Sequence, residues 1–340
     1  MIKKELVNRW KTNEGQRLLK EVIGCLEKGN LLNSVNGLGK FSGRWDLRGA
    51  QLSELTKKRK LESGGYSLEQ SYGSLKIKNA LIESVDFSFS DISYSVWELC
   101  KISNCLFDET KAKEIHFIAC EISNTVFRKT DFSYSFMNEN IGKESGAYKN
   151  VIFTEANLNE CIFSFPIVKN SVFENCNLYA TNFDGSRMEN CKFIGEVNSP
   201  WFRGYSVTAH KSTFGIFNRI DPKKYPNEMK DVDFSKAKLI GVSFSHSIDL
   251  SKCIFPNSSD YIYVENLGDL MKQVRATIAS EWQGEYRRRG LVLVDTVYYK
   301  KDKYDQRHDL IDTFPVPSSD ILFDEKFFNL IKATNNQSKN

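Results

Sequence analysis

The sequence predicts an all-β solenoid with four sides over residues 45–257, between a helical N-terminal cap over residues 1–44 and a helix-rich C-terminal domain over residues 258–340. Two observations predict the solenoid: a large apolar residue recurs every five positions, and a small residue lies two positions before it. A period of five fits neither a helix nor a strand, so no single regular element can bury every large residue. A chain that turns a corner every five residues can bury them all.

The five-residue period runs in two series that differ in phase. The large residues of the first are Ile77, Ile82, Phe87, Ile92, Trp97, Ile102, Phe107, Ala112, Phe117, Ile122, Phe127, Phe132 and Met137, of which only alanine is small. Those of the second are Tyr148, Phe153, Leu158, Phe163, Val168, Phe173, Leu178, Phe183, Met188 and Phe193. If four sides make one coil, residues twenty apart stack, and phenylalanine indeed recurs at that spacing. If the segment between Met137 and Tyr148 is a loop that skips no side, the steps are 20 or 21 with one step of 26 across that loop. The predicted column is then Phe87, Phe107, Phe127, Phe153, Phe173, Phe193, Phe214, Phe234 and Phe255.

The repeating unit resembles that of a known family. Val85-Asp86-Phe87, Thr130-Asp131-Phe132 and Cys176-Asn177-Leu178 each combine a small residue, Asp or Asn, and then Phe or Leu. This is similar to the unit of the pentapeptide-repeat family, and the resemblance covers roughly residues 45–257. It implies a right-handed quadrilateral β-helix. It implies almost nothing about activity, because fold and function are separable and the family is functionally diverse.

Three segments interrupt the repeat. Residues 53–74 contain the basic run Lys57, Lys58, Arg59 and Lys60 and a Gly-Gly turn signal, which predict a loop. Residues 138–147 predict a second loop, and residues 220–230, with two prolines, an irregular coil or a third. Loops on a rigid scaffold are frequent binding sites, and a tolerated insertion explains each of these segments equally well.

Both ends of the chain show helical periodicity. In the cap, Gly15 is predicted to mark a break between two helices. Near the other end, residues 266–289 are predicted to form a helix and residues 291–299 a strand. The C-terminal segment 258–340 is longer than a cap requires, so we expect it to form a small α+β domain or a dimer surface.

The residue types that usually carry chemistry are explained by packing. Seven of the eight cysteines occupy the small inward position, which favours burial over a metal or redox role. Cys100 and Cys120 stack one turn apart, but a reducing cytosol disfavours a disulfide between them. The four histidines are scattered, without a ligand set or a nucleophile relay. We therefore expect no enzymatic activity, no cofactor and no metal site. A cytoplasmic location is expected, because the sequence has neither a membrane-spanning apolar run nor a secretion signal.

The first functional hypothesis is a non-enzymatic scaffold that binds a protein partner. Its candidate sites are the basic loop at Lys57, Lys58, Arg59 and Lys60, the loop at 138–147, and the C-terminal domain with Arg287, Arg288 and Arg289. The C-terminal domain could also form a homodimer.

Two alternatives remain. The resemblance implies that the protein could mimic DNA and bind a type II topoisomerase such as gyrase, as some family members do in quinolone protection or inhibition. The charge does not favour this, because residues 77–137 carry 6 basic against 9 acidic side chains and residues 1–60 carry 14 against 6. Direct nucleic-acid binding through the two basic runs is the other alternative, although such runs are more often solvated surface.

Overall fold

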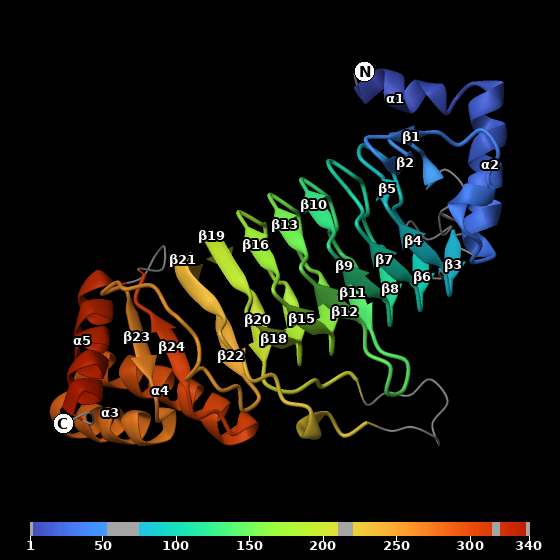
Figure 1. Cartoon of the computed structure of the whole chain (residues 1–340). Helices are drawn as coiled ribbons and strands as arrows, with labels where there is room; N and C mark the ends of the chain where they lie inside the picture. The colour runs from blue at the N-terminus through green and yellow to red at the C-terminus, as the bar shows by residue number, and fades with distance from the viewer. Residues whose placement is uncertain (1–2, 53–74, 210–219, 315–319, 338–340) are drawn as a thin grey trace, which may run out of the picture.

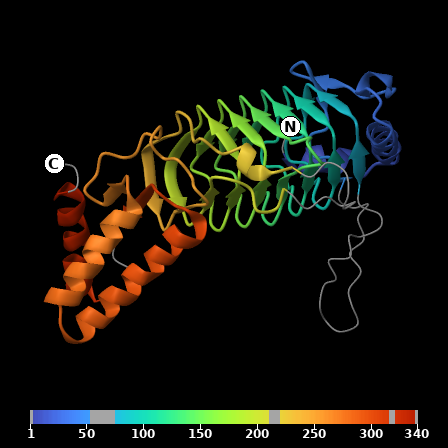
Figure 2. The same ribbon diagram turned by 90° about the horizontal axis from the view of Figure 1, so that it is seen from below.

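The computed structural model describes residues 3–52, 75–209, 220–314 and 320–337. Figure 1 shows a rod of stacked coils with helices at both ends, and Figure 2 shows the same rod turned by 90°. The N-terminal end carries α1 (Lys3–Arg9), α2 (Asn13–Glu27) and the short helix η1 (Leu32–Ser34). Among the described residues, no helix is long and apolar enough to cross a membrane.

The rod is a β-helix with four sides, which we number in chain order. Side 1 is an eight-stranded parallel sheet of β3 (Lys76–Lys78), β6 (Val96–Glu98), β8 (His116–Ile118), β11 (Phe136–Glu139), β14 (Ile162–Ser164), β17 (Asn182–Asp184), β20 (Trp201–Arg203) and β22 (Ser243–Ser245). Side 2 is a six-stranded parallel sheet of β4 (Leu81–Glu83), β7 (Lys101–Ser103), β9 (Glu121–Ser123), β12 (Ala147–Lys149), β15 (Ile167–Lys169) and β18 (Arg187–Glu189).

Sides 3 and 4 complete each coil. Side 3 contains the parallel strands β10 (Val126–Arg128), β13 (Ile152–Thr154), β16 (Val172–Glu174), β19 (Lys192–Asn198) and β21 (Asp233–Ile240), and near the N-terminal end β1 (Lys40–Phe41), β2 (Arg44–Asp46) and β5 (Val85–Asp86). Side 4 is held by isolated parallel bridges such as Asp91 to Lys111 and Asn157 to Asn177. Partners on neighbouring coils are twenty residues apart, as in Ile102 with Ile122 and Phe153 with Phe173. The predicted quadrilateral β-helix is therefore confirmed.

The corners explain how five residues can make one side. The residue two positions after most inward centres has a positive φ, for example Phe89 at 64° and Asn104 at 54°. This left-handed conformation is unfavourable for most residues, and asparagine tolerates it best. The corner N–H groups offset part of that cost by donating to the next coil, as Phe89 does to the Asp108 carbonyl at 2.8 Å.

Phenylalanines stack along the inside of side 3, and here one prediction is wrong. Ring centroids are 4.8 Å apart between Phe173 and Phe193 and 4.9 Å apart between Phe193 and Phe234. Since β19 also pairs directly with β21, no coil lies between them. Phe214 is therefore not a member of the column and lies outside the described residues. The stacked residues are Phe87, Phe107, Phe127, Phe153, Phe173, Phe193, Phe234 and Phe255.

The small inward residues add hydrogen bonds between coils. The Thr110 hydroxyl donates to the Phe87 carbonyl at 2.8 Å, and the Cys120 thiol donates to the Trp97 carbonyl at 3.1 Å. Serine, threonine and cysteine are therefore interchangeable there: each is small and can donate to the preceding coil. All eight cysteines are free thiols, and all except Cys253 are buried. Burial raises the pKa of Cys105 and of Cys176 to about 12.

The N-terminal helices cover the first coil, but their break is not at Gly15. It lies at residues 10–12. Thr12 caps the N-terminus of α2, and its hydroxyl accepts a hydrogen bond from the Gly15 N–H at 3.0 Å. Gly15 serves close packing instead, because a Cβ there would lie 2.1 Å from the Arg9 carbonyl oxygen. Leu19, Val22, Ile23 and Leu26 join the core of the β-helix.

The C-terminal domain has a hydrophobic core of its own. It consists of the antiparallel pair β23 (Tyr261–Val264) and β24 (Asp309–Asp312) with α3 (Leu267–Glu281), α4 (Gly284–Tyr304) and α5 (Ile321–Gln337). The strand predicted over residues 291–299 is wrong, because this segment belongs to α4. Gly290 and Val294, four residues apart, are buried, and Gly290 lies against Ile278 of α3. Packing on α3 therefore selects the helical period over the alternation in the sequence.

Candidate functional site: two excursions from one corner

Both described excursions from the β-helix leave at the corner between sides 1 and 2. The first lies between β11 and β12 and lengthens one coil, so that Phe127 pairs with Phe153, 26 residues later. It contains the predicted loop at 138–147. The second begins after β20 and returns at Lys230, which pairs with Glu189 of side 2. It is longer than the predicted 220–230 interruption, and Figure 1 shows both along the lower edge of the rod.

A buried carboxylate anchors the start of the second excursion. The Asp184 side chain on β17 is fully buried and forms an ion pair of 2.9 Å with Arg203. It also accepts hydrogen bonds from the Ser206 hydroxyl at 2.6 Å, the Thr208 hydroxyl at 2.6 Å and the Val207 N–H at 3.1 Å. Burial alone would raise the pKa of Asp184, but these hydrogen bonds and the ion pair outweigh it, so the pKa lies below its usual value. The excursion is thus tied to side 1 by a charged group.

Gly185 permits this close approach. Its φ is 61°, and a Cβ at this position would lie 2.3 Å from the Ser206 nitrogen. Any other residue would therefore clash with the excursion backbone as well as adopt an unfavourable conformation.

The two excursions also contact each other. The Asn140 side-chain amide of the first donates to the Ala209 carbonyl of the second at 3.1 Å. Between them, Phe165 of the β-helix corner is buried in a small apolar cluster with Ala209 and Ile220. We call this surface the loop platform and define it as residues 138–147, 204–209 and 220–229. Its parts come from distant positions in the sequence but are joined by direct contacts.

One cationic side chain that contacts the loop platform has no acidic partner among the residues that the structure describes. Arg187 on β18 donates from Nη2 to the Ser145 hydroxyl at 2.5 Å and to the Phe165 carbonyl at 3.4 Å. Its guanidinium carbon is 4.4 Å from the centroid of the Phe165 ring and 5.9 Å from that of Tyr225. Nε is buried and has no hydrogen-bond partner. Burial lowers the pKa of Arg187. Sequence reasoning missed this residue, because nothing in the repeat distinguishes it from other outward positions.

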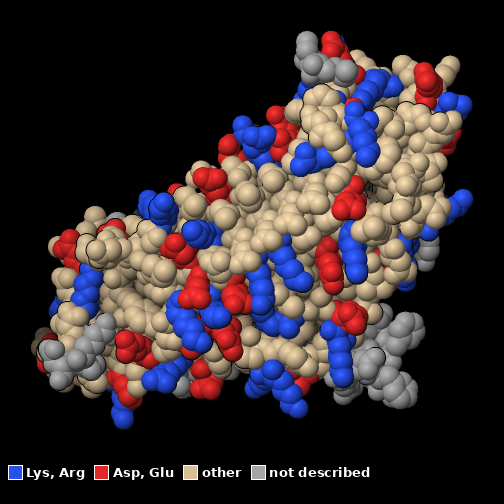
Figure 3. Space-filling view, in the orientation of Figure 1, with Lys and Arg blue, Asp and Glu red and all other residues tan. Residues whose placement is uncertain are grey.

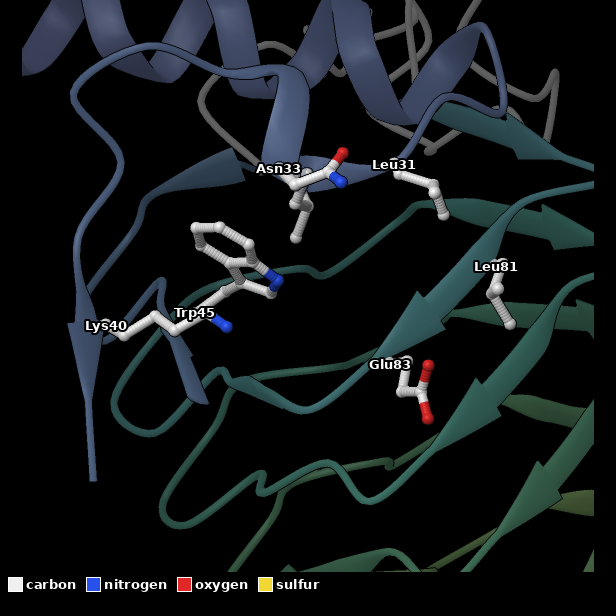
Figure 4. A pocket seen from close by; sticks show the side chains of 7 residues that line it. Leu31, Asn33, Lys40, Trp45, Leu81 and Glu83 are labelled. Carbon is white, nitrogen blue, oxygen red and sulfur yellow. The ribbon is translucent and has the colours of Figure 1, made fainter. Parts of the chain in front are cut away.

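A cavity of about 250 Å³ lies between the N-terminal segment and the first coil (Figure 4). Its lining consists of Leu31, Leu32, Asn33, Lys40, Trp45, Leu81 and Glu83. The Lys40 ammonium is 4.4 Å from the centroid of the Trp45 ring, so its charge already makes a cation–π contact within the protein. The cavity is smaller than the roughly 300–1,000 Å³ usual for ligand sites. It is therefore the weaker candidate.

The predicted partner-binding residues are only partly described. Lys57, Lys58, Arg59 and Lys60 lie outside the described residues. In α4, Arg288 pairs with Glu285 at 2.6 Å, and Arg289 pairs with Asp320 at 3.3 Å. Arg287 is exposed. Successive helical residues point about 100° apart, so these three side chains do not form one basic surface. Their role in binding stays a prediction.

The C-terminal domain exposes apolar side chains instead. Val292 and Leu293 on α4 are 58% and 41% exposed, and Ile321 and Leu322 at the start of α5 are 62% and 70% exposed. Large exposed apolar residues on a folded domain often mark an interaction surface.

The described histidine His116 and many surface charges are engaged in contacts within the β-helix. His116 stacks on Phe136 and lies 3.2 Å from the Glu139 carboxylate. Within the described ranges there is no group of three side chains that could hold a metal ion. Along the face in Figure 3, Lys and Arg are interspersed with Asp and Glu. Several charges on the β-helix pair, as Lys169 and Lys230 do with Glu189 at 2.5 and 2.9 Å.

Comparison with known proteins identifies the repeats. The family model described as pentapeptide repeats matches residues 152–195 with 8 copies. Residues 152–195 therefore match the family that the resemblance implied. A search of curated proteins gives no match.

Three solved structures illustrate the likeness. The pentapeptide-repeat protein Rfr23 from the cyanobacterium Cyanothece 51142 is 14% identical, with 36% of this chain and 91% of that chain covered and a TM-score of 0.31. HetL, involved in heterocyst differentiation regulation in the cyanobacterium Nostoc sp. strain PCC 7120, is 11% identical, with 55% and 91% covered and a TM-score of 0.23. QnrB1, a plasmid-mediated fluoroquinolone resistance protein, is 14% identical, with 58% and 91% covered and a TM-score of 0.20. Such scores add nothing to what the strand pairing already establishes.

Proposed function

We propose that this protein is a non-enzymatic pentapeptide-repeat scaffold and that the loop platform binds a protein partner. The observation that carries the proposal is that both excursions leave one corner and are fixed to each other and to the β-helix by Asp184, Asn140 and Phe165. A surface ordered before binding loses less conformational entropy when the partner binds, so more of the contact energy remains as affinity. A scaffold role is favoured over catalysis because packing occupies the inward positions of the coils.

The part of the platform that comes from the first excursion can be removed without disturbing the repeat. Deletion of residues 140–145 would reduce the 26-residue step between Phe127 and Phe153 to 20 and join Glu139 to Gly146. The resulting corner has the regular order of small residue, outward residue and large centre, so we expect the β-helix to fold. Affinity capture with the full-length protein and this variant, followed by mass spectrometry, should show partners that only the full-length protein retains. If the deletion retains every partner, the platform is not the binding site.

A second contact is proposed at the C-terminal domain, where a second copy of the chain would cover Val292, Leu293, Ile321 and Leu322. Sedimentation velocity of the wild type and of Leu322→Asp tests this. Because this side chain is 70% exposed, the substitution should leave the fold intact and shift the protein from dimer to monomer. A wild type that is monomeric at tens of micromolar would contradict the homodimer and leave this surface for another partner.

The DNA-mimic alternative is less well supported by the surface. A mimic of a polyanion needs outward carboxylates in excess, whereas here many are neutralised in pairs such as Arg128 with Asp108 and Lys129 with Glu155. We expect no change in gyrase supercoiling, with or without a quinolone, at micromolar protein. Inhibition or protection in that assay would favour the mimic.

A further inference from the structure

We infer that the partner of the loop platform presents an acidic polypeptide segment and that Arg187 holds one of its carboxylates. This inference rests on the proposed function and adds the chemistry of the partner. It starts from a contrast between arginines of similar burial. Arg9 and Arg48 each pair with Asp46, at 2.7 and 2.8 Å, and Arg203 pairs with Asp184 at 2.9 Å. Arg187 has only a hydroxyl and a carbonyl as hydrogen-bond partners among the described residues.

An unpaired cation in such a place is costly. A guanidinium loses much of its hydration when it is partly buried, and a carboxylate normally compensates for that loss. The ring of Phe165 compensates only in part through its quadrupole. Residues 210–219, between the two described parts of the second excursion, contain neither Asp nor Glu, so they cannot supply the carboxylate. The described residues together with 210–219 thus leave a place for an anion from outside.

The guanidinium is already held in position. Contacts of Nη2 with Ser145 and Phe165 fix its orientation, while Nη1 has no partner among the described residues and is not buried. A carboxylate that reaches Nη1 would form a charge-assisted hydrogen bond in a partly dry site, where such bonds are strongest. The side-chain entropy of Arg187 has already been lost on folding, so binding would not incur that cost again.

The surroundings favour a polypeptide over a nucleic acid. Residues 204–209 and 220–229 contain Lys223 and Lys224 against Asp221 and Glu228, a net charge of 0 (2 − 2), and residues 138–147 contain Lys143 against Glu139 and Glu144, a net charge of −1 (1 − 2). This is too little positive charge to follow a phosphate backbone. Exposed apolar side chains lie on the same surface, with Ile141 39% and Tyr225 44% exposed. Acidic residues next to apolar ones in the partner would match this combination.

The test is a fluorescence anisotropy titration with the full-length protein. The probe is a fluorescein-labelled peptide of sequence Glu-Glu-Phe-Glu-Glu-Phe-Glu-Glu, and its counterpart has Gln in place of every Glu. Lys101 supplies the matched control, because it occupies the same outward position on side 2, is exposed and lies on β7 away from both excursions. We expect Arg187→Gln to weaken binding of the acidic peptide about tenfold or more, Lys101→Gln to change it less than about twofold, and the Gln peptide not to bind.

One further variant and a DNA competitor distinguish the remaining outcomes. Arg187→Lys keeps the charge and guards against loss of packing in the Gln variant, so it should bind with intermediate affinity. Equal weakening by both Gln variants, or equal competition by a DNA duplex, would overturn the inference in favour of unspecific charge attraction. If Arg187→Gln binds the peptide as the wild type does while deletion of residues 140–145 still loses cellular partners, the acidic segment is wrong and the proposed function stands. If that deletion retains all partners, the proposed function itself fails.

Discussion

Substitution of Asp184 by Asn tests whether the buried carboxylate holds the loop platform together. The carboxylate accepts five hydrogen bonds, from Arg203 Nη1, the hydroxyls of Ser206 and Thr208, and the N–H groups of Val207 and Thr208. In the variant, the two hydroxyls can rotate to accept from the new amide group, but a backbone N–H cannot. Arg203 loses its anionic partner as well.

These losses give the expected magnitude. A hydrogen bond to a charged group contributes about 1.5–3 kcal/mol, and an ordinary amide hydrogen bond about 0.5–1.5 kcal/mol. Arg203 is 22% exposed and can regain some hydration, which lowers the cost. We therefore expect the free energy of local opening of residues 206–209 to fall by about 3 kcal/mol. At about 1.36 kcal/mol per decade, this corresponds to a loss of roughly a hundredfold in hydrogen-exchange protection.

Native-state hydrogen exchange read by mass spectrometry measures this opening. Peptides that cover residues 204–209 should lose protection, while those that cover β13 and β16 should not change, because each coil contacts mainly its neighbours. Asp295→Asn is the matched control: it removes the same charge from an ion pair with Arg275 in which the side chains are 54% and 48% exposed. Unchanged protection at 204–209 in the Asp184 variant, or an equal loss there in the control, would refute the reasoning.

Three further predictions concern the same structure. The protection of residues 204–209 should stay constant as the pH falls from 7 to about 4 and decrease only below that. The reason is that the Asp184 carboxylate has a lowered pKa: it stabilises the fold fully above its unfolded pKa of about 3.8, and this stabilisation is lost as the pH falls through the lower folded pKa. A decrease that persists in Asp184→Asn would assign the effect to another group. Phe173→Ala should reduce the free energy of unfolding in urea by about 3–5 kcal/mol, because it removes a ring that stacks on Phe153 and Phe193, and a change under about 1 kcal/mol would show that the column relaxes around the gap. Thiol titration at pH 8 should leave the buried repeat cysteines unreactive, because burial keeps them as thiols, as in Cys191 with a pKa of about 11. All eight thiols should react only after denaturant is added. Rapid reaction of several thiols in the native protein would contradict the burial.

The excursions could be located in the sequence, but their arrangement could not be predicted. Gaps in the five-residue period marked residues 138–147 and part of the second excursion, because any insertion interrupts the periodic pattern. The contact between Asn140 and Ala209 joins residues 69 apart, and that between Ser164 and Thr208 joins residues 44 apart. No local pattern encodes such pairs. For the same reason Asp184 and Arg187 looked like ordinary outward residues of the repeat.

Two predictions were wrong because a local pattern fitted a competing structure. Phe214 has the right spacing for the phenylalanine column, yet the chain leaves the β-helix before it, and Phe234 takes the next place above Phe193. Residues 291–299 alternate like a strand, yet packing of Gly290 and Val294 on α3 makes them helical. In both segments a tertiary contact decided between two readings that the residues alone permitted.

The β-helix, its four sides and the filling of its interior could be predicted from the sequence, because every side of every coil needs one large and one small inward residue. That requirement produces the same pattern every five residues. Tertiary structure alone decided that both excursions leave one corner and meet, that Asp184 anchors the second, and that Arg187 lies beneath them without a carboxylate. Those features depend on single contacts between distant residues, which occur once and therefore leave no periodic trace in the sequence.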